Sequence, residues 1–111
     1  MTGEAKGFGK AIALRLSEER VKTALVDINE KSGMEMCRCM REEERESEFF
    51  LCDMEVEDDV KRMVEDIHTK FGSIDFLVNN VDIIRVGLLW KPSTDVFDEI
   101  ARTNLKGPFY V

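Results

Sequence analysis

Three glycines near the start of the chain have a type and spacing that could do chemistry. Gly3, Gly7 and Gly9 stand four and then two positions apart, and a helix-forming run continues from them to Leu16. Glycine permits a tight turn and keeps a Cβ out of the path of a diphosphate, and the N-terminus of the following helix attracts its charge. We therefore expect this turn to bind a dinucleotide, through Gly3, Gly7, Phe8 and Gly9.

Polar side chains follow three short apolar runs, each at the point where the run ends. The runs are 23–26, 49–52 and 74–78, and they lead into Asp27, Asp53 and the pair Asn79-Asn80. Such runs are typical of strands buried on both faces of a parallel sheet. Ligands bind at the carboxyl ends of parallel strands, so these side chains are expected to meet along one edge.

Asp27 indicates which dinucleotide is bound. It lies 24 residues after Gly3, close to the interval at which an acidic residue accepts hydrogen bonds from an adenosine ribose. A carboxylate there repels a 2′-phosphate, which favours NAD over NADP. Lys6 in the turn would favour NADP, but a like charge beside a phosphate costs more than one exposed lysine recovers. The alternative is that Asp27 is an ordinary turn residue.

Helices are expected to alternate with the apolar runs. The apolar spacing and capping residues predict helices from about Phe8 to Leu16, from 30 to 45 after Asn29, from 57 to 71 before Gly72, and from Ser93 or Thr94 through Ala101, with a bend over 104–108. This alternation is typical of parallel α/β layers with right-handed crossovers. His68 is expected on the surface, and the stretch 87–90 in the core.

Composition excludes several other classes of protein. The 111 residues are enough for one domain, and the net charge of −7 argues against a nucleic-acid partner. Cys37, Cys39 and Cys52 match no zinc or disulfide framework, which favours a reducing, cytoplasmic setting. No apolar run approaches the roughly 18 residues of a membrane span, so no membrane partner is expected.

Taken in order, these motifs resemble the N-terminal part of a short-chain dehydrogenase/reductase. The matching pieces are Thr2-Gly3-x-x-x-Gly7-x-Gly9, Asp27, Cys52-Asp53-Met54, Asn79-Asn80 and Asn104-Leu105-x-Gly107. The resemblance implies a Rossmann-like parallel sheet with flanking helices, with residues 1–111 forming a partial NAD(P)-binding Rossmann domain.

The resemblance also implies roles for individual residues. Asp53 would contact the adenine, Asn80 would brace the sheet, and Asn104 would hold a water in the proton relay of catalysis. Ile28 and Met54, beside the two aspartates, would also contact the cofactor. The family often associates through the helix that matches the one carrying Asn104, so a homo-oligomer is expected.

The chain departs from the family pattern in three places. Asp82 stands where the family has glycine, so cofactor binding is expected to be weaker. The catalytic serine and Tyr-x-x-x-Lys have no counterpart, since Tyr110 is the one tyrosine and no lysine follows it. Few residues precede the glycine turn, so the first strand is expected to be largely missing. The runs 23–26 and 74–78 would then each lose a neighbour, which favours aggregation or strand exchange. We interpret the chain as a fragment without its C-terminal half.

Three functional hypotheses follow. The first is the cofactor-binding part of an NAD(H)-dependent alcohol or carbonyl oxidoreductase. The second is a non-catalytic protein that binds a nucleotide or pairs with a full-length relative. The third is a remnant of the fold that binds no ligand.

Overall fold

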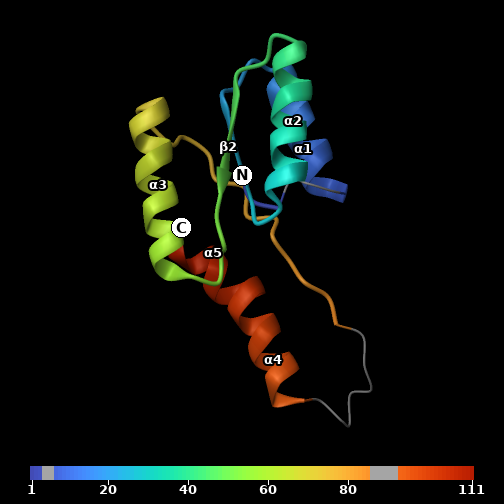
Figure 1. Cartoon of the computed structure of the whole chain (residues 1–111), viewed down its shortest axis with the longest axis vertical. Helices are drawn as coiled ribbons and strands as arrows, with labels where there is room; N and C mark the ends of the chain where they lie inside the picture. Colours follow the sequence, from blue (N-terminus) through green and yellow to red (C-terminus); the bar gives the residue numbers. More distant parts are fainter. Residues whose placement is uncertain (4–6, 86–92) are drawn as a thin grey trace.

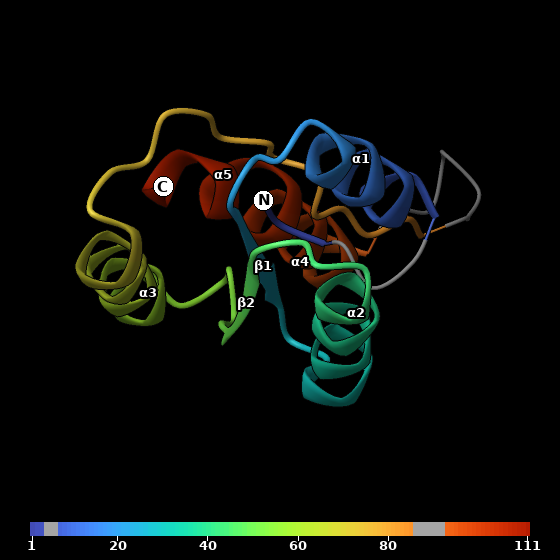
Figure 2. The ribbon, with the colours of Figure 1, turned by 90° about the horizontal axis from the view of Figure 1, so that it is seen from above.

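Two parallel strands form the centre of the computed structural model, and helices cover both faces. The structure describes residues 1–3, 7–85 and 93–111. Its elements are α1 (Gly7–Glu18), β1 (Thr23–Asp27), α2 (Glu30–Glu42), β2 (Ser47–Leu51), α3 (Glu57–Phe71), α4 (Thr94–Ala101), the π-helical segment η1 (Arg102–Lys106) and α5 (Gly107–Tyr110). Helices α1 and α2 lie on one side of the strands and α3 lies on the other (Figures 1 and 2). The expected α/β fold is confirmed.

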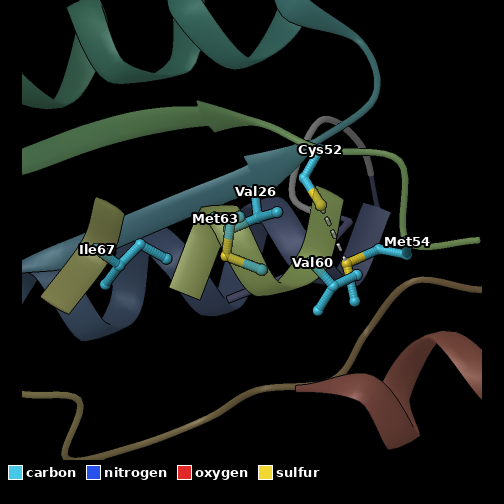
Figure 3. Close-up of a cluster of buried hydrophobic side chains, with 6 residues drawn as sticks. All are labelled: Val26, Cys52, Met54, Val60, Met63 and Ile67. Carbon is cyan, nitrogen blue, oxygen red and sulfur yellow. Dashed lines mark hydrogen bonds between the residues drawn. The ribbon is translucent and has the colours of Figure 1, made fainter. Parts of the chain in front are cut away.

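The two strands pair in register from Thr23 opposite Ser47 to Asp27 opposite Leu51. Side chains alternate across a strand, so β1 supplies both layers of the core. Leu25 packs against α1 and α2, and Val26 packs against α3. The α3 side of the core, shown in Figure 3, consists of Val26, Cys52, Met54, Val60, Met63 and Ile67. Burial on both faces of β1 is what its continuous apolar run predicts.

Helix α3 is the element that the sequence describes best. Its buried stripe is Val60, Met63 and Ile67, and Gly72 ends it with a φ of +84°. Acidic residues occupy its first turn, where the helix dipole favours them. His68 is exposed on this helix, as expected.

Helix α2 begins as expected and ends earlier. The Asn29 side chain accepts a hydrogen bond from the Ser32 N–H at 3.1 Å, which caps the helix. The prediction that it runs to residue 45 is wrong, because Glu44 takes a left-handed φ of +58° and turns the chain back. Strand β2 therefore starts at Ser47, two residues before the expected run.

The predicted strand over 74–78 is wrong. In the described part of the chain, this segment makes one backbone hydrogen bond, from the Thr2 N–H to the Val78 carbonyl at 3.0 Å. A strand needs a continuous backbone partner, and among the described residues the neighbour of 74–78 is segment 1–3, which forms an isolated bridge with β1 at Thr2 and Val26. Phe76 is consequently 80% exposed.

The C-terminal helices change pitch where a bend was expected. Ser93 precedes α4, but its side chain makes no capping bond; its carbonyl accepts from the Phe97 N–H. After Ala101 the helix widens into η1 and returns to α-helix at Gly107. The Gly107 N–H donates to the Arg102 carbonyl five residues back, and Pro108, which has no N–H, follows directly. No described helix is long and apolar enough to cross a membrane.

Candidate cofactor site

The glycine turn begins at the carboxyl end of β1. Segment 1–3 runs beside that strand: the Val26 N–H donates to the Met1 carbonyl at 2.9 Å, and the Gly3 N–H donates to the Val26 carbonyl at 2.9 Å. On its other side, the Thr2 N–H donates to Val78. The chain therefore enters the turn between β1 and the residues that precede Asn80.

Gly3 occupies a position that other residues cannot share. Its φ is +69°, and a Cβ at this point would lie 3.0 Å from the backbone of Val81. The Asn80 amide nitrogen donates to the Gly3 carbonyl at 2.8 Å, so Asn80 braces the turn. The absence of a side chain lets three segments of backbone meet at the end of the sheet.

The helix that follows begins at a second glycine with a left-handed backbone. Gly7 has a φ of +59°, and a Cβ there would meet no described atom within 4 Å. Phe8 is 85% exposed, and Gly9 is buried on the inner side of α1. Lys6 and the stretch 87–90, for which the sequence analysis also makes predictions, lie outside the described residues.

Asp27 ends β1, on the same edge of the sheet as the glycine turn. One of its carboxylate oxygens accepts the Asn29 N–H at 2.9 Å, which sets the side chain at the start of α2. Ile28, the next residue, is 66% exposed. An anchored carboxylate beside an exposed aliphatic side chain is suited to hold a ribose and cover its base.

Asp53 and Met54 follow β2 on this edge but differ in exposure. The Asp53 carboxylate accepts the Glu55 N–H at 2.9 Å, which closes a tight turn. Met54 is buried with its sulfur 4.0 Å from the Cys52 sulfur (Figure 3), so its backbone rather than its side chain could meet a ligand. Burial, together with the charges of Asp59 and Asp53, raises the pKa of the Cys52 thiol to about 11, which keeps it neutral.

Asn104 lies on η1 and holds the segment that follows Asn80. Its amide oxygen accepts the Ile83 N–H at 2.8 Å, and its amide nitrogen donates to the Ile83 carbonyl at 3.0 Å. Asp82 is exposed beside this clamp, next to the Val81 backbone on which Gly3 packs. The site therefore carries a negative charge close to the glycine turn.

Sequence reasoning missed Thr2 as a residue of the site. Thr2 is buried, and its hydroxyl accepts the Asn80 N–H at 3.1 Å and donates to the Val78 carbonyl at 3.4 Å. Its place directly before the first glycine was the available signal. An apolar cleft of about 480 Å³ begins at Thr2, Val26 and Val78 and extends toward the opposite end of β1, so it shares residues with this site.

Comparisons with known proteins agree on one family. A family model described as short chain dehydrogenase matches residues 1–111. An uncharacterized oxidoreductase of Thermotoga maritima is 31% identical over 109 residues, which are 98% of this chain and 43% of that protein. A 3-oxoacyl-(acyl-carrier-protein) reductase of Staphylococcus aureus is 34% identical over 113 residues, again 98% of this chain and 45% of the relative.

A solved structure gives the same result at the level of the fold. A citronellol catabolism dehydrogenase of Pseudomonas aeruginosa matches with a TM-score of 0.93 and 29% identity, over 99% of this chain and 45% of that one. The chain thus spans less than half the length of these relatives. Proteins of this kind use nicotinamide dinucleotides and are often oligomeric. The chain belongs to the short-chain dehydrogenase/reductase family.

Proposed function

We propose that residues 1–111 are the NAD(H)-binding part of an alcohol or carbonyl oxidoreductase. The observation that carries this proposal is the Gly3 turn, which opens into the N-terminus of α1 on the edge of the sheet where Asp27 ends β1. The space at Gly7 suits a diphosphate, because no described side chain lies within 4 Å of the position of a Cβ there. A bound nicotinamide dinucleotide supplies hydride exchange between an alcohol and a carbonyl.

Different residues would contact different parts of the cofactor. The first backbone N–H groups of α1, at Gly7, Phe8 and Gly9, are free of helical partners and suit the diphosphate. Asp27 would accept hydrogen bonds from the hydroxyls of the adenosine ribose, and Ile28 would pack against the base.

The remaining contacts lie around the adenine and at the other end of the site. Asp53 and the backbone of Met54 would meet the adenine, and Asn80 supports the turn from below. Asn104 would hold a water for proton transfer.

We favour NAD over NADP because of charge. A 2′-phosphate would lie beside the Asp27 carboxylate, and two negative charges about 4 Å apart repel by roughly 1 to 4 kcal/mol, depending on the local dielectric.

The acid–base residues of the reaction are proposed to come from outside the matched part. More than half the length of the relatives lies there. A tyrosine whose pKa is lowered by a lysine would exchange the proton with the substrate.

Calorimetric titration of the 111-residue chain with NADH tests this proposal. Binding is expected, with an affinity limited by Asp82. Asp82→Gly is expected to tighten binding about fivefold, since an exposed like charge costs up to about 1 kcal/mol. Asp82→Asn separates charge from bulk, because it removes only the charge. A folded chain that binds no NADH, in either the parent or the Asp82→Gly form, would refute the proposal.

A further inference from the structure

Glu55 joins two parts of the candidate site that are far apart in sequence. Its backbone N–H donates to the Asp53 carboxylate at 2.9 Å, which shapes the turn after β2. Its own carboxylate accepts a hydrogen bond from the Thr103 hydroxyl and pairs with the Arg102 guanidinium at 3.4 Å. Thr103 directly precedes Asn104 on η1.

We propose that Glu55 is a positioning residue that holds Asn104 and the Asp53 turn in one arrangement. This inference rests on the proposed function, in which Asp53 meets the adenine and Asn104 serves the reacting end of the site. A single carboxylate would thereby set the distance between the group that meets the adenine and the group that holds the water for proton transfer.

On the side of the turn, helix backbone packs directly on Met54. A Cβ at Gly107 would lie 2.9 Å from the Met54 carbonyl oxygen, so the start of α5 rests against the turn with no side chain between them. Met54 is itself buried in the core. The turn therefore cannot move without moving the helix, and Glu55 ties the two together at the edge of this contact.

On the side of the helix, the connection continues through consecutive residues. Thr103 is 5% exposed, so its hydroxyl depends on Glu55 for an acceptor. Asn104, the next residue, holds both backbone groups of Ile83. The path therefore runs from Asp53 through Glu55 and η1 to Ile83. A π-helical segment is a common feature of functional sites, because it alters where consecutive side chains point.

The Thr103 bond carries most of this coupling. Arg102 and Glu55 are both partly exposed, and an exposed ion pair contributes little. A hydrogen bond from a buried hydroxyl to a carboxylate is stronger, and its loss leaves a buried donor without a partner. Glu55→Gln keeps an oxygen acceptor for Thr103 and loses the charge, whereas Glu55→Ala removes both.

Hydrogen exchange of the Ile83 amide measures the coupling without any cofactor. Glu55→Ala is expected to accelerate exchange at Ile83 about tenfold, while the amide of Leu25 in the core exchanges within about twofold of the parent rate. Glu55→Gln should restore the parent rate at Ile83. Thr103→Val should accelerate exchange at Ile83 as much as Glu55→Ala does. The double variant should exchange no faster than either single variant, because both changes break the same interaction. Glu65→Ala, at an exposed glutamate on α3, is the control.

NADH titration supplies the second measurement. Glu55→Ala should weaken binding about tenfold, and Glu55→Gln by less than about twofold. The inference is overturned if Ile83 exchange is unchanged in Glu55→Ala, if Ile83 and Leu25 accelerate equally, or if glutamine fails to rescue. Should Glu55→Ala not fold, Thr103→Val decides by the same criteria. A parent chain that binds no NADH refutes the proposed function, and the exchange results still decide whether Glu55 positions Asn104.

Discussion

Replacing Asp27 with asparagine isolates the charge that we hold responsible for cofactor choice. The Asp27 carboxylate accepts the Asn29 N–H at 2.9 Å, and Asn29 in turn caps α2. Asparagine offers a carbonyl oxygen to the same N–H, so the turn and the helix cap are retained. The substitution therefore removes a charge from the candidate site with little change in its shape.

The expected effect has two parts that act in the same direction. NADH loses a charge-assisted hydrogen bond to its ribose and keeps a neutral one, which costs about 1 kcal/mol. NADPH is relieved of repulsion between its 2′-phosphate and the carboxylate, which gains about 2 kcal/mol at an intermediate dielectric. The ratio of the two affinities should then shift toward NADPH by about 3 kcal/mol, or about 100-fold.

Titration calorimetry with NADH and NADPH on the parent chain and on Asp27→Asn measures that ratio directly. Asp75→Asn is the matched control, because Asp75 is an exposed aspartate beside the cleft toward the opposite end of β1. A shift of less than about threefold in Asp27→Asn would refute the assignment of Asp27. An equal shift in Asp75→Asn would refute it as well, since net charge alone would then explain the effect.

Three further predictions concern packing, titration and the exposed apolar segment. Gly33→Ala should lower the free energy of unfolding, measured in urea, by about 1 kcal/mol, because the new Cβ would lie 2.0 Å from the Phe49 ring and the strain exceeds the gain in helix propensity. Adding Phe49→Leu should restore stability. An unchanged urea midpoint in Gly33→Ala would contradict the close contact between Gly33 and Phe49. The pKa of Cys52 is raised from 9.0 to about 11, so its contribution to stability is complete below pH 9 and is lost as the pH rises to 11. In urea titrations, the free energy of unfolding of Cys52→Ala should therefore decline less between pH 9 and pH 11 than that of the parent. An equal decline in both chains would count against this prediction. Phe76→Thr should reduce self-association in sedimentation experiments and leave the free energy of unfolding within about 0.5 kcal/mol, since the side chain is 80% exposed.

Local patterns in the sequence predicted the elements whose structure is decided locally. The stripe of Val60, Met63 and Ile67 with Gly72 after it specified α3 from end to end. Asn29 likewise specified where α2 begins. The end of α2 could not be predicted, because the left-handed turn at Glu44 falls on a glutamate, and no glycine or asparagine marks it.

Prediction failed where pairing with a distant segment decides the outcome. The run 74–78 has the composition of a buried strand, yet its state depends on the backbone beside it. In the described residues, that neighbour contributes a single backbone-to-backbone hydrogen bond, from the Thr2 N–H to the Val78 carbonyl. Composition predicts what a strand would bury, and it does not reveal whether a partner is present.

The candidate site shows the same division. The glycines and Asp27 were visible in the sequence because close approach and charge require those residue types. The bonds that hold them together were not visible: Thr103 and Glu55 are 48 positions apart, and Asn104 and Ile83 are 21 apart. Many residue types could form such bonds, so no sequence motif predicts them.

The glycine turn is held by hydrogen bonds to two neighbouring segments, and this links cofactor binding to local stability. Segment 1–3 is held by backbone bonds to β1 and Val78 and by the hydrogen bonds of Thr2 and Gly3 with Asn80. The terminal ammonium of Met1 also donates to the Ala24 carbonyl at 2.9 Å. In the part of the chain that the structure describes, this segment is also the hydrogen-bonded link between β1 and the residues before Asn80. Local opening of this segment would break these bonds together. A ligand that binds the closed turn would stabilise it by mass action, so the same bonds would determine both the order of this edge of the sheet and its affinity for the cofactor.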